Sequence, residues 1–216
     1  CKIAAECHVG GMLANKAGIV HFHLGDGYGR LKLLKRMLDE TEIPARVLNP
    51  THCNRGADLF EEATELAMRG CTIDVTAHGP ILLNPVWLRA SVCVRKYLQD
   101  PRNPPKDKIT VSSDGGGSFP RFDESGILVG IGVGNLHTLL HILNELLTGE
   151  GGTYEPLRLE EVLPAFTSNW ASLLRIGKAK GAIREGMDAD LIVLDDAPEG
   201  PKGALRITDV MAMGKW

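Results

Sequence analysis

The chain has 216 residues, of which 44% are hydrophobic and 24% are charged, and its formal net charge at pH 7 is −3. This composition is typical of a globular protein, and it excludes a disordered chain or one that binds nucleic acid through a basic surface. The apolar stretches are short, so none approaches the roughly 20 apolar residues that a membrane helix needs. We therefore expect a soluble protein with no nucleic-acid partner and no membrane partner.

Four short apolar runs, each ending in a polar residue, predict buried parallel strands. Helical patterns separate them and are closed or opened by Gly, Asn and Pro. The last strand residues His23, His52 and Asp114 are 29 and 62 positions apart, about one and two strand–helix units. This order is typical of a βα barrel or a doubly wound sheet. The predicted strands are 17–23, 45–52, 71–76 and 108–114, and the predicted helices are 30–41, 57–69 and 85–98.

The remainder of the chain predicts two more helices and then a change of character. A helix is expected over 135–147, and after a loop and the segment 159–165 comes a short helix opening at Ser168 and Asn169. From Gly181 onward, 181–195 and 207–216 read as strands of a small β-sheet. We therefore expect part of a barrel over 1–180 and strands of a small β-sandwich domain over 181–216.

The number of strands limits the architecture within the α/β class. A closed (β/α)8 barrel has eight strands and typically about 250 residues, whereas only four barrel-type strands are predicted here. The sequence therefore indicates half of a TIM-type barrel. A complete, four-stranded open sheet is the alternative that composition does not exclude.

His23, His52 and Asp114 all lie where predicted strands end, which is where βα barrels carry their functional groups. Two imidazoles and a carboxylate are ligand types that a catalytic zinc accepts while leaving a position for water. Water bound to zinc loses a proton near neutral pH and becomes a nucleophile. The sequence therefore predicts a metal site. The alternative is three unrelated capping or core polar groups.

The other histidines have weaker signals. His21 and His23 share one face of a strand, and we assign His23 to the metal and His21 to a lower core layer. The alternative takes both as the paired ligands of a first barrel strand. His137 and His141 predict a surface pair on a helix, because no Glu follows the first of them as it does in zinc proteases. His78 follows a strand end and is a candidate for the outer shell of the site.

Arg55 lies three residues after His52, on the loop that leaves the second strand. Its planar fork of N–H donors is suited to gripping a carboxylate in two places. The alternative is a surface arginine in a salt bridge. The glycines near Asp114 lack the spacing of a phosphate-binding loop, so that signal is weak.

Five scattered cysteines, with no Cys-x-x-Cys pair, indicate buried free thiols in a reducing cytosol rather than a disulfide framework. We therefore expect a cytoplasmic protein. The chain begins with neither an initiator Met nor a signal-peptide pattern, which predicts a piece of a longer protein. The cysteines are Cys1, Cys7, Cys53, Cys71 and Cys93.

Two motifs, Thr-His-Cys-Asn-Arg at 51–55 and Ser-Ser-Asp-Gly-Gly-Gly-Ser-Phe-Pro at 112–120, resemble the isoaspartyl dipeptidases of the metal-dependent amidohydrolase superfamily. The resemblance extends over nearly the whole chain and implies that it is the C-terminal half of such an enzyme. Further matching segments are 9–11, 16–18, 22–26, 121–124, 167–169 and 186–191, the last being common to many amidohydrolases.

The resemblance implies a role for five residues. His23 and His52 would be the fifth- and sixth-strand ligands of the more exposed of two zinc ions. Asp114 would be the eighth-strand ligand of the buried zinc and the general base. Arg55 and Ser118 would hold the terminal carboxylate of the substrate. The implied reaction is hydrolysis of β-aspartyl dipeptides by a homo-oligomeric enzyme, with a small dipeptide as the only expected partner besides zinc.

The chain differs from the family in its metal ligands. It lacks the first-strand His pair and the fourth-strand carboxylated Lys that bridges the two metals. Lys16 and Lys35 fall in a loop and a helix and do not replace that lysine. We expect the isolated chain to be inactive and prone to association, with an apolar inner face meant for a missing half. The alternatives are a non-catalytic half-barrel, a fragment that needs a partner, or an amidohydrolase acting on another amide.

Overall fold

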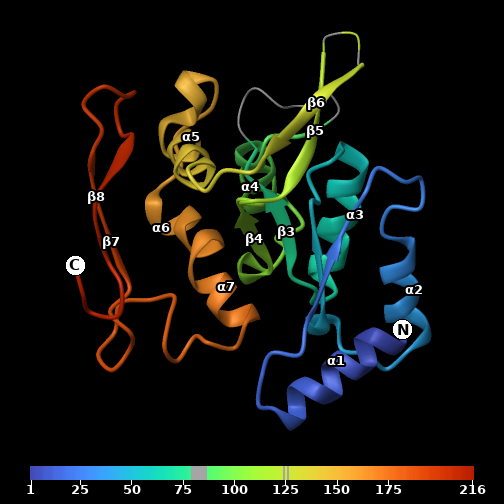
Figure 1. Cartoon of the computed structure of the whole chain (residues 1–216). Coiled ribbons are helices and arrows are strands. Elements are labelled where there is room, and N and C mark those ends of the chain that lie inside the picture. Colours follow the sequence, from blue (N-terminus) through green and yellow to red (C-terminus); the bar gives the residue numbers. More distant parts are fainter. Residues whose placement is uncertain (79–86, 124, 126) are drawn as a thin grey trace.

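The computed structural model describes residues 1–78, 87–123, 125 and 127–216 (Figure 1). Helices and strands alternate through the first half of the chain, as the sequence predicts. The strands are β1 (Val20–His23), β2 (Leu48–Thr51), β3 (Ile73–Thr76), β4 (Ile109–Ser112), β5 (Ser118–Phe122), β6 (Leu128–Val133), β7 (Leu191–Asp196) and β8 (Leu205–Met211). The helices are α1 (Lys2–Leu13), α2 (Lys32–Glu40), α3 (Ala57–Met68), α4 (Ala90–Leu98), α5 (Thr138–Gly152), α6 (Leu159–Val162) and α7 (Ser168–Leu173), with 3-10 turns η1 (Ala45–Val47), η2 (Lys106–Lys108) and η3 (Leu163–Phe166).

The four predicted barrel strands are present and parallel. β1 pairs with β2 so that His23 lies opposite Thr51, and β3 pairs with β4 so that Ile73 lies opposite Ile109. The two pairs are neighbours, because the Cys53 N–H donates to the carbonyl of Asp74 at 3.0 Å. The described residues thus confirm four parallel strands with helices between them, and these residues form no closed barrel.

The hydrophobic core lies between one face of these strands and the helices. Every second strand residue points toward the helices, as the two-residue period of a strand requires. Ile73 and Val75 of β3 and Ile109 of β4 are fully buried there, together with Leu66 of α3 and Ile142 of α5. We call this the outer face, and it anchors the strands whose ends carry the candidate site.

The opposite, inner face is polar, so the prediction of an apolar inner face is wrong. The period of two places polar residues on it from all four strands. The polar side chains on this face form hydrogen bonds to one another across the strands, and these bonds take the place of apolar packing. The inner-face residues are His21, His23, Asn49, Thr51, Asp74, Thr76, Thr110 and Ser112.

Two elements were not predicted. α1 contains Gly10 and Gly11 and buries only Ala4 and Gly11, so it has no apolar stripe by which a helix is recognised. The antiparallel β5–β6 hairpin follows β4 and projects from the molecule (Figure 1). In β6 the exposed Val129, Ile131 and Val133 alternate with glycines, which are depleted in strands, so the strand signal is weak.

The C-terminal strands form an antiparallel ribbon on the far side of α5–α7 from α2 (Figure 1). Asn144 of α5 fastens it, because its amide donates to the Leu205 carbonyl and accepts from the Leu205 N–H, both at 2.8 Å. The strands are shorter or shifted relative to 181–195 and 207–216. The assignment of 181–216 to a separate domain stays a prediction.

The predicted helix over 85–98 is observed as α4 from Ala90 to Leu98, and its expected start at residue 85 lies outside the described residues.

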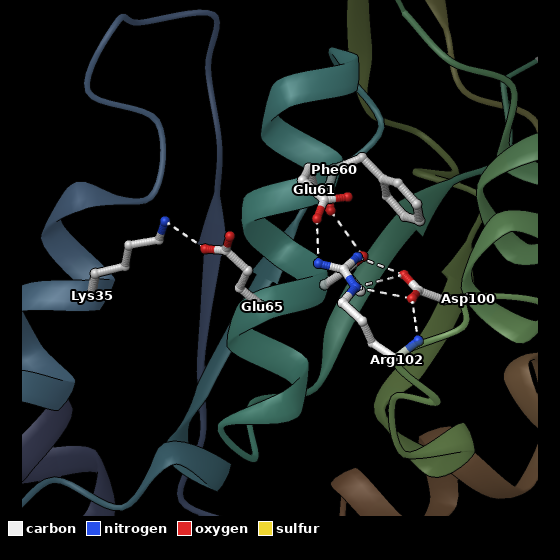
Figure 2. A network of polar contacts seen from close by, with 7 residues as sticks. Lys35, Phe60, Glu61, Glu65, Asp100 and Arg102 are labelled. Carbon is white, nitrogen blue, oxygen red and sulfur yellow. Dashed lines mark hydrogen bonds and ion pairs between the residues drawn. The ribbon is translucent and has the colours of Figure 1, made fainter.

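Exposed ion pairs connect α3 to the segments on either side of it (Figure 2). Arg102, in the connection from α4 to β4, bonds to Glu61 and to Asp100. Lys35 of α2 donates to Glu65 at 3.0 Å. Exposed pairs of this kind contribute little stability each, so they orient α3 rather than hold the fold.

Two predictions from composition can be compared with the structure. All five cysteines are free, and Cys53, Cys71 and Cys93 are buried, whereas Cys1 is exposed. Within the described ranges, no helix has the length and apolar character to cross a membrane.

Candidate active site

His23 and His52 meet at the ends of β1 and β2. His23 Nδ1 lies 3.0 Å from His52 Nε2, within hydrogen-bonding distance. The backbone of His52 turns out of the strand with a positive φ of 62°, which is uncommon for residues other than glycine. On the other side of its ring, Nδ1 lies 2.7 Å from the hydroxyl oxygen of Thr76, at the end of β3. Thr76 therefore orients His52 so that its second nitrogen faces His23.

The protonation of His52 and the spacing of the two nitrogens suit metal ligation. Burial, together with the charge of Arg55, lowers the pKa of His52 to about 4, so its imidazole is neutral at neutral pH. Neutral imidazole is the ligand form. Two nitrogens bound tetrahedrally to zinc lie about 3.3 Å apart, given zinc–nitrogen bonds of about 2.0 Å. The observed separation of 3.0 Å is close to this value, so the spacing of the two nitrogens matches that of two ligands of one cation as well as that of a hydrogen bond.

Asp114 follows β4 and, like His52, has a positive φ, here 50°. Its carboxylate lies against the backbone of Gly117, where an added Cβ would be 2.6 Å from Oδ1. A Cβ on Gly134 would likewise collide with the Asp114 carbonyl. The glycines after β4 therefore make room for Asp114, which is a more specific role than phosphate binding.

Asp114 lies near the histidines without joining them in one cluster. Its negative charge acts to raise the pKa of both His52 and His78, although burial dominates and lowers both to about 4. No group of three or more metal-ligating side chains forms among the described residues. The structure thus brings His23 and His52 together and places Asp114 within electrostatic reach.

Arg55 lies beside this pair, on the loop after His52. The loop is fixed by Asn54, whose side-chain amide donates to the carbonyls of Thr76 at 3.1 Å and Leu88 at 2.9 Å. The Arg55 guanidinium lies over the ring of Trp87, 4.7 Å from its centroid, and NH1 is 3.5 Å from Asp26 Oδ2. The loop therefore holds a cation within electrostatic reach of His52, whose pKa it helps to lower.

Ser118 is not joined to Arg55. It is the first residue of β5, is exposed, and lies opposite Val133 in the hairpin. Within the described part of the chain, no hydrogen bond connects the two side chains. Their joint role in binding a carboxylate stays a prediction.

The remaining histidines fall into two groups. His78 lies at the site, with its ring 4.9 Å from that of Trp87, as expected of the outer shell. His21 is exposed and lies 2.6 Å from Asn49 Oδ1, so its assignment to a buried core layer is wrong in this structure. His141 lies on α5, where it contacts Glu145 at 3.0 Å.

Sequence reasoning missed Asp74, a fully buried carboxylate in the middle of β3. It accepts hydrogen bonds from the hydroxyls of Thr51 at 2.5 Å, Ser112 at 2.6 Å and Thr110 at 2.9 Å. Burial raises its pKa to about 6 despite these three donors. Asp74 therefore ties β2, which leads to His52, to β4, which leads to Asp114. An acidic residue within an apolar strand was the available signal.

Comparison with known proteins adds an independent observation. The model of the amidohydrolase family matches residues 14–216. A solved β-aspartyl dipeptidase from the keratin degrader Fervidobacterium islandicum AW-1, in complex with a β-Asp-Leu dipeptide, is 36% identical with a TM-score of 0.80, over 99% of this chain and 51% of that one. A second structure of a β-aspartyl dipeptidase from the same organism is 33% identical with a TM-score of 0.77, over 99% and 49%.

Two other matches are more distant. An amidohydrolase from Thermotoga maritima MSB8 is 19% identical with a TM-score of 0.58, over 96% of this chain and 45% of that one, and shows the fold alone. An imidazolonepropionase from Thermoplasma volcanium is 45% identical over 42 residues, which is 19% of this chain and 10% of that protein. The chain spans about half the length of the dipeptidases that it matches. Since the family model covers nearly all of it, the chain belongs to the amidohydrolase family.

Proposed function

We propose that this chain is part of a zinc-dependent hydrolase that cleaves the isopeptide bond of β-aspartyl dipeptides. The observation that carries the proposal is the His23–His52 pair, with nitrogens 3.0 Å apart and with His52 held by Thr76. The similarity to dipeptidases at 36% and 33% identity, one of them solved with β-Asp-Leu, supports the substrate class.

In this proposal His23, His52 and Asp114 are metal ligands, and a zinc ion bound there would supply an activated water for attack on the peptide carbonyl. The donor types suit zinc, since two imidazoles and a carboxylate leave room for water. In the family arrangement His23 and His52 would hold the more exposed zinc and Asp114 the buried one, whereas the first-strand His pair and the bridging carboxylated lysine are not among the residues discussed above. Other ligands would therefore have to come from elsewhere in the complete enzyme.

Asp114 is proposed as the general base, because its carboxylate is partly exposed and electrostatically coupled to His52. It would take a proton as the water attacks and pass it to the leaving amine. Arg55 is proposed to bind the terminal carboxylate of the dipeptide, with Ser118 as a second donor. The carboxylate-binding role fits the position of Arg55, which lies three residues after the proposed ligand His52 and whose charge acts on that histidine.

The test is hydrolysis by the longest gene product that contains this chain. We expect cleavage of β-Asp-Leu, no cleavage of α-Asp-Leu, loss of activity on chelation, and recovery on addition of zinc. Equal cleavage of the α- and β-linked dipeptides would refute the substrate assignment. Full activity after exhaustive chelation would refute the metal-dependent mechanism.

A further inference from the structure

We propose that Trp87 is a positioning residue that holds the Arg55 guanidinium ready for a substrate carboxylate and thereby sets the preference for a free C-terminus. This inference rests on the proposed function. It concerns a residue just before α4, more than thirty positions from Arg55 in the sequence.

Two hydrogen bonds bring the two segments together. The Leu88 N–H donates to the Asn54 carbonyl at 2.8 Å, and the Asn54 side-chain amide donates to the Leu88 carbonyl at 2.9 Å. Leu88 follows Trp87 directly, and Asn54 precedes Arg55 directly. The backbone therefore places the indole under the guanidinium, and the stack is not a chance meeting of two surface side chains.

The stack itself is well enclosed. Trp87 is only 6% exposed, and the guanidinium carbon of Arg55 lies 4.7 Å from its ring centroid. His78 contacts the same indole at 4.9 Å between ring centroids, which restricts rotation of the tryptophan. A cation over an aromatic face is attracted more strongly as water is removed, and here the ring is buried while the Arg55 side chain is 20% exposed.

An aromatic ring and a carboxylate can both hold a guanidinium in place, but only the ring leaves its N–H donors without an acceptor. A ring face attracts the guanidinium without accepting its N–H hydrogen bonds, so the planar donor fork stays available for a carboxylate. Arg55 Nε is buried and has no hydrogen-bond acceptor among the described residues. Asp26, the acid that contacts Arg55, does so at 3.5 Å and is largely exposed. The arrangement holds Arg55 in place with the support of the indole, with Nε buried and a side chain that is 20% exposed, so that the terminal nitrogens are the donors offered to an anionic ligand.

The experiment compares Trp87→Ala and Trp87→Phe in the longest gene product, using β-Asp-Leu and its C-terminal amide. We expect Trp87→Ala to raise KM for the free acid roughly tenfold with kcat nearly unchanged, and to leave KM for the amide unchanged. Trp87→Phe keeps a ring face and should restore KM to within about threefold of the wild-type value. Calorimetric titration with β-Asp-Leu should show the same order of affinities.

Tyr154→Ala is the matched control, because it removes a similar stack, that of Arg95 at 5.0 Å, elsewhere in the molecule. This variant should leave both KM values unchanged. A wild-type KM in Trp87→Ala, an equal rise for acid and amide, or a Trp87→Phe protein as impaired as Trp87→Ala would each overturn the inference while the wild-type enzyme remains active. If the wild-type protein neither binds nor cleaves β-Asp-Leu, the proposed function fails and this inference with it.

Discussion

The outer and inner faces of β1–β4 belong to the same four-residue strands but carry opposite chemistry. On the outer face, Ile73, Val75 and Ile109 are fully buried against helices. On the inner face, Asp74 and Thr76 form hydrogen bonds that reach the neighbouring strands and His52. The outer face therefore holds the fold through burial, and the inner face fixes the site through directed bonds. Substitutions on the two faces should have separable effects on stability and on turnover.

The largest effect is expected at the end of the inner face. His52→Ala removes a proposed ligand, and kcat should fall by more than about 100-fold, the upper range for loss of an outer-shell partner. Steady-state kinetics on β-Asp-Leu is the measurement. His137→Ala, on an exposed histidine outside the site, should retain wild-type kcat. Wild-type turnover in His52→Ala would break the link between the inner face and chemistry.

An outer-face substitution should affect stability instead. Ile73→Ala empties a fully buried position and should lower the free energy of unfolding by about 2–5 kcal/mol, while kcat in the folded protein stays unchanged. Urea denaturation gives the stability difference. Ile131→Ala, at a position that is 72% exposed, should change stability by less than about 0.5 kcal/mol. Equal losses from the two variants would mean that the outer face is not the core.

The pH dependence of stability should separate the buried groups of the site. The pKa of His52 and His78 is lowered to about 4, so the unfolded state binds more protons between pH 4 and the ordinary histidine pKa of about 6.5. Stability should therefore rise with pH across that window, by up to roughly 3 kcal/mol for His52 alone.

Asp74 acts in the opposite direction, because its pKa is raised to about 6 and the folded state binds the extra proton. Its contribution to stability is present at low pH and is lost as pH rises from about 4 to 6. Asp74→Asn should steepen the rise of stability with pH, and His52→Asn should flatten it, in urea titrations of chelated protein. Parallel pH profiles for the wild type and both variants would contradict the two assignments.

A smaller effect is expected at Arg55. Lysine keeps the charge but lacks the planar fork, so Arg55→Lys should raise KM for β-Asp-Leu about tenfold with metal content unchanged. The comparison substrate is the C-terminal amide, for which the wild-type and variant proteins should have the same KM. If both proteins treat the acid and the amide alike, Arg55 does not bind the carboxylate.

The sequence predicted the elements whose side-chain pattern is set by burial. β1–β4 and the helices α2 and α3 were found because short apolar runs and apolar stripes repeat at a fixed spacing. α1 was missed because Gly10 and Gly11 interrupt its pattern, and β6 because Gly130 and Gly132 weaken its strand signal. The inner face was misjudged because the strands were taken to be apolar on both faces, whereas β1 is exposed on its inner face and the other strands carry hydrogen-bonded polar side chains there.

For the site, strand ends indicated His23, His52 and Asp114, and the structure brings the first two into contact. What the sequence could not provide was the partner of each side chain. Thr76 orients His52, and Trp87 lies under Arg55, through contacts between segments 22 to 34 positions apart that no local pattern encodes. Asp74 was overlooked because one acid within an apolar run gives no hint of three hydroxyl donors on other strands.

The most direct test of the metal assignment is elemental analysis of the longest gene product that contains this chain, compared with its His23→Ala, His52→Ala double variant. If these histidines are ligands, the wild-type protein carries zinc and the double variant retains less, with the far-UV circular dichroism of the two proteins unchanged. The same zinc content in both folded proteins would contradict the account, because the 3.0 Å pair would then be only a hydrogen bond between two strand ends.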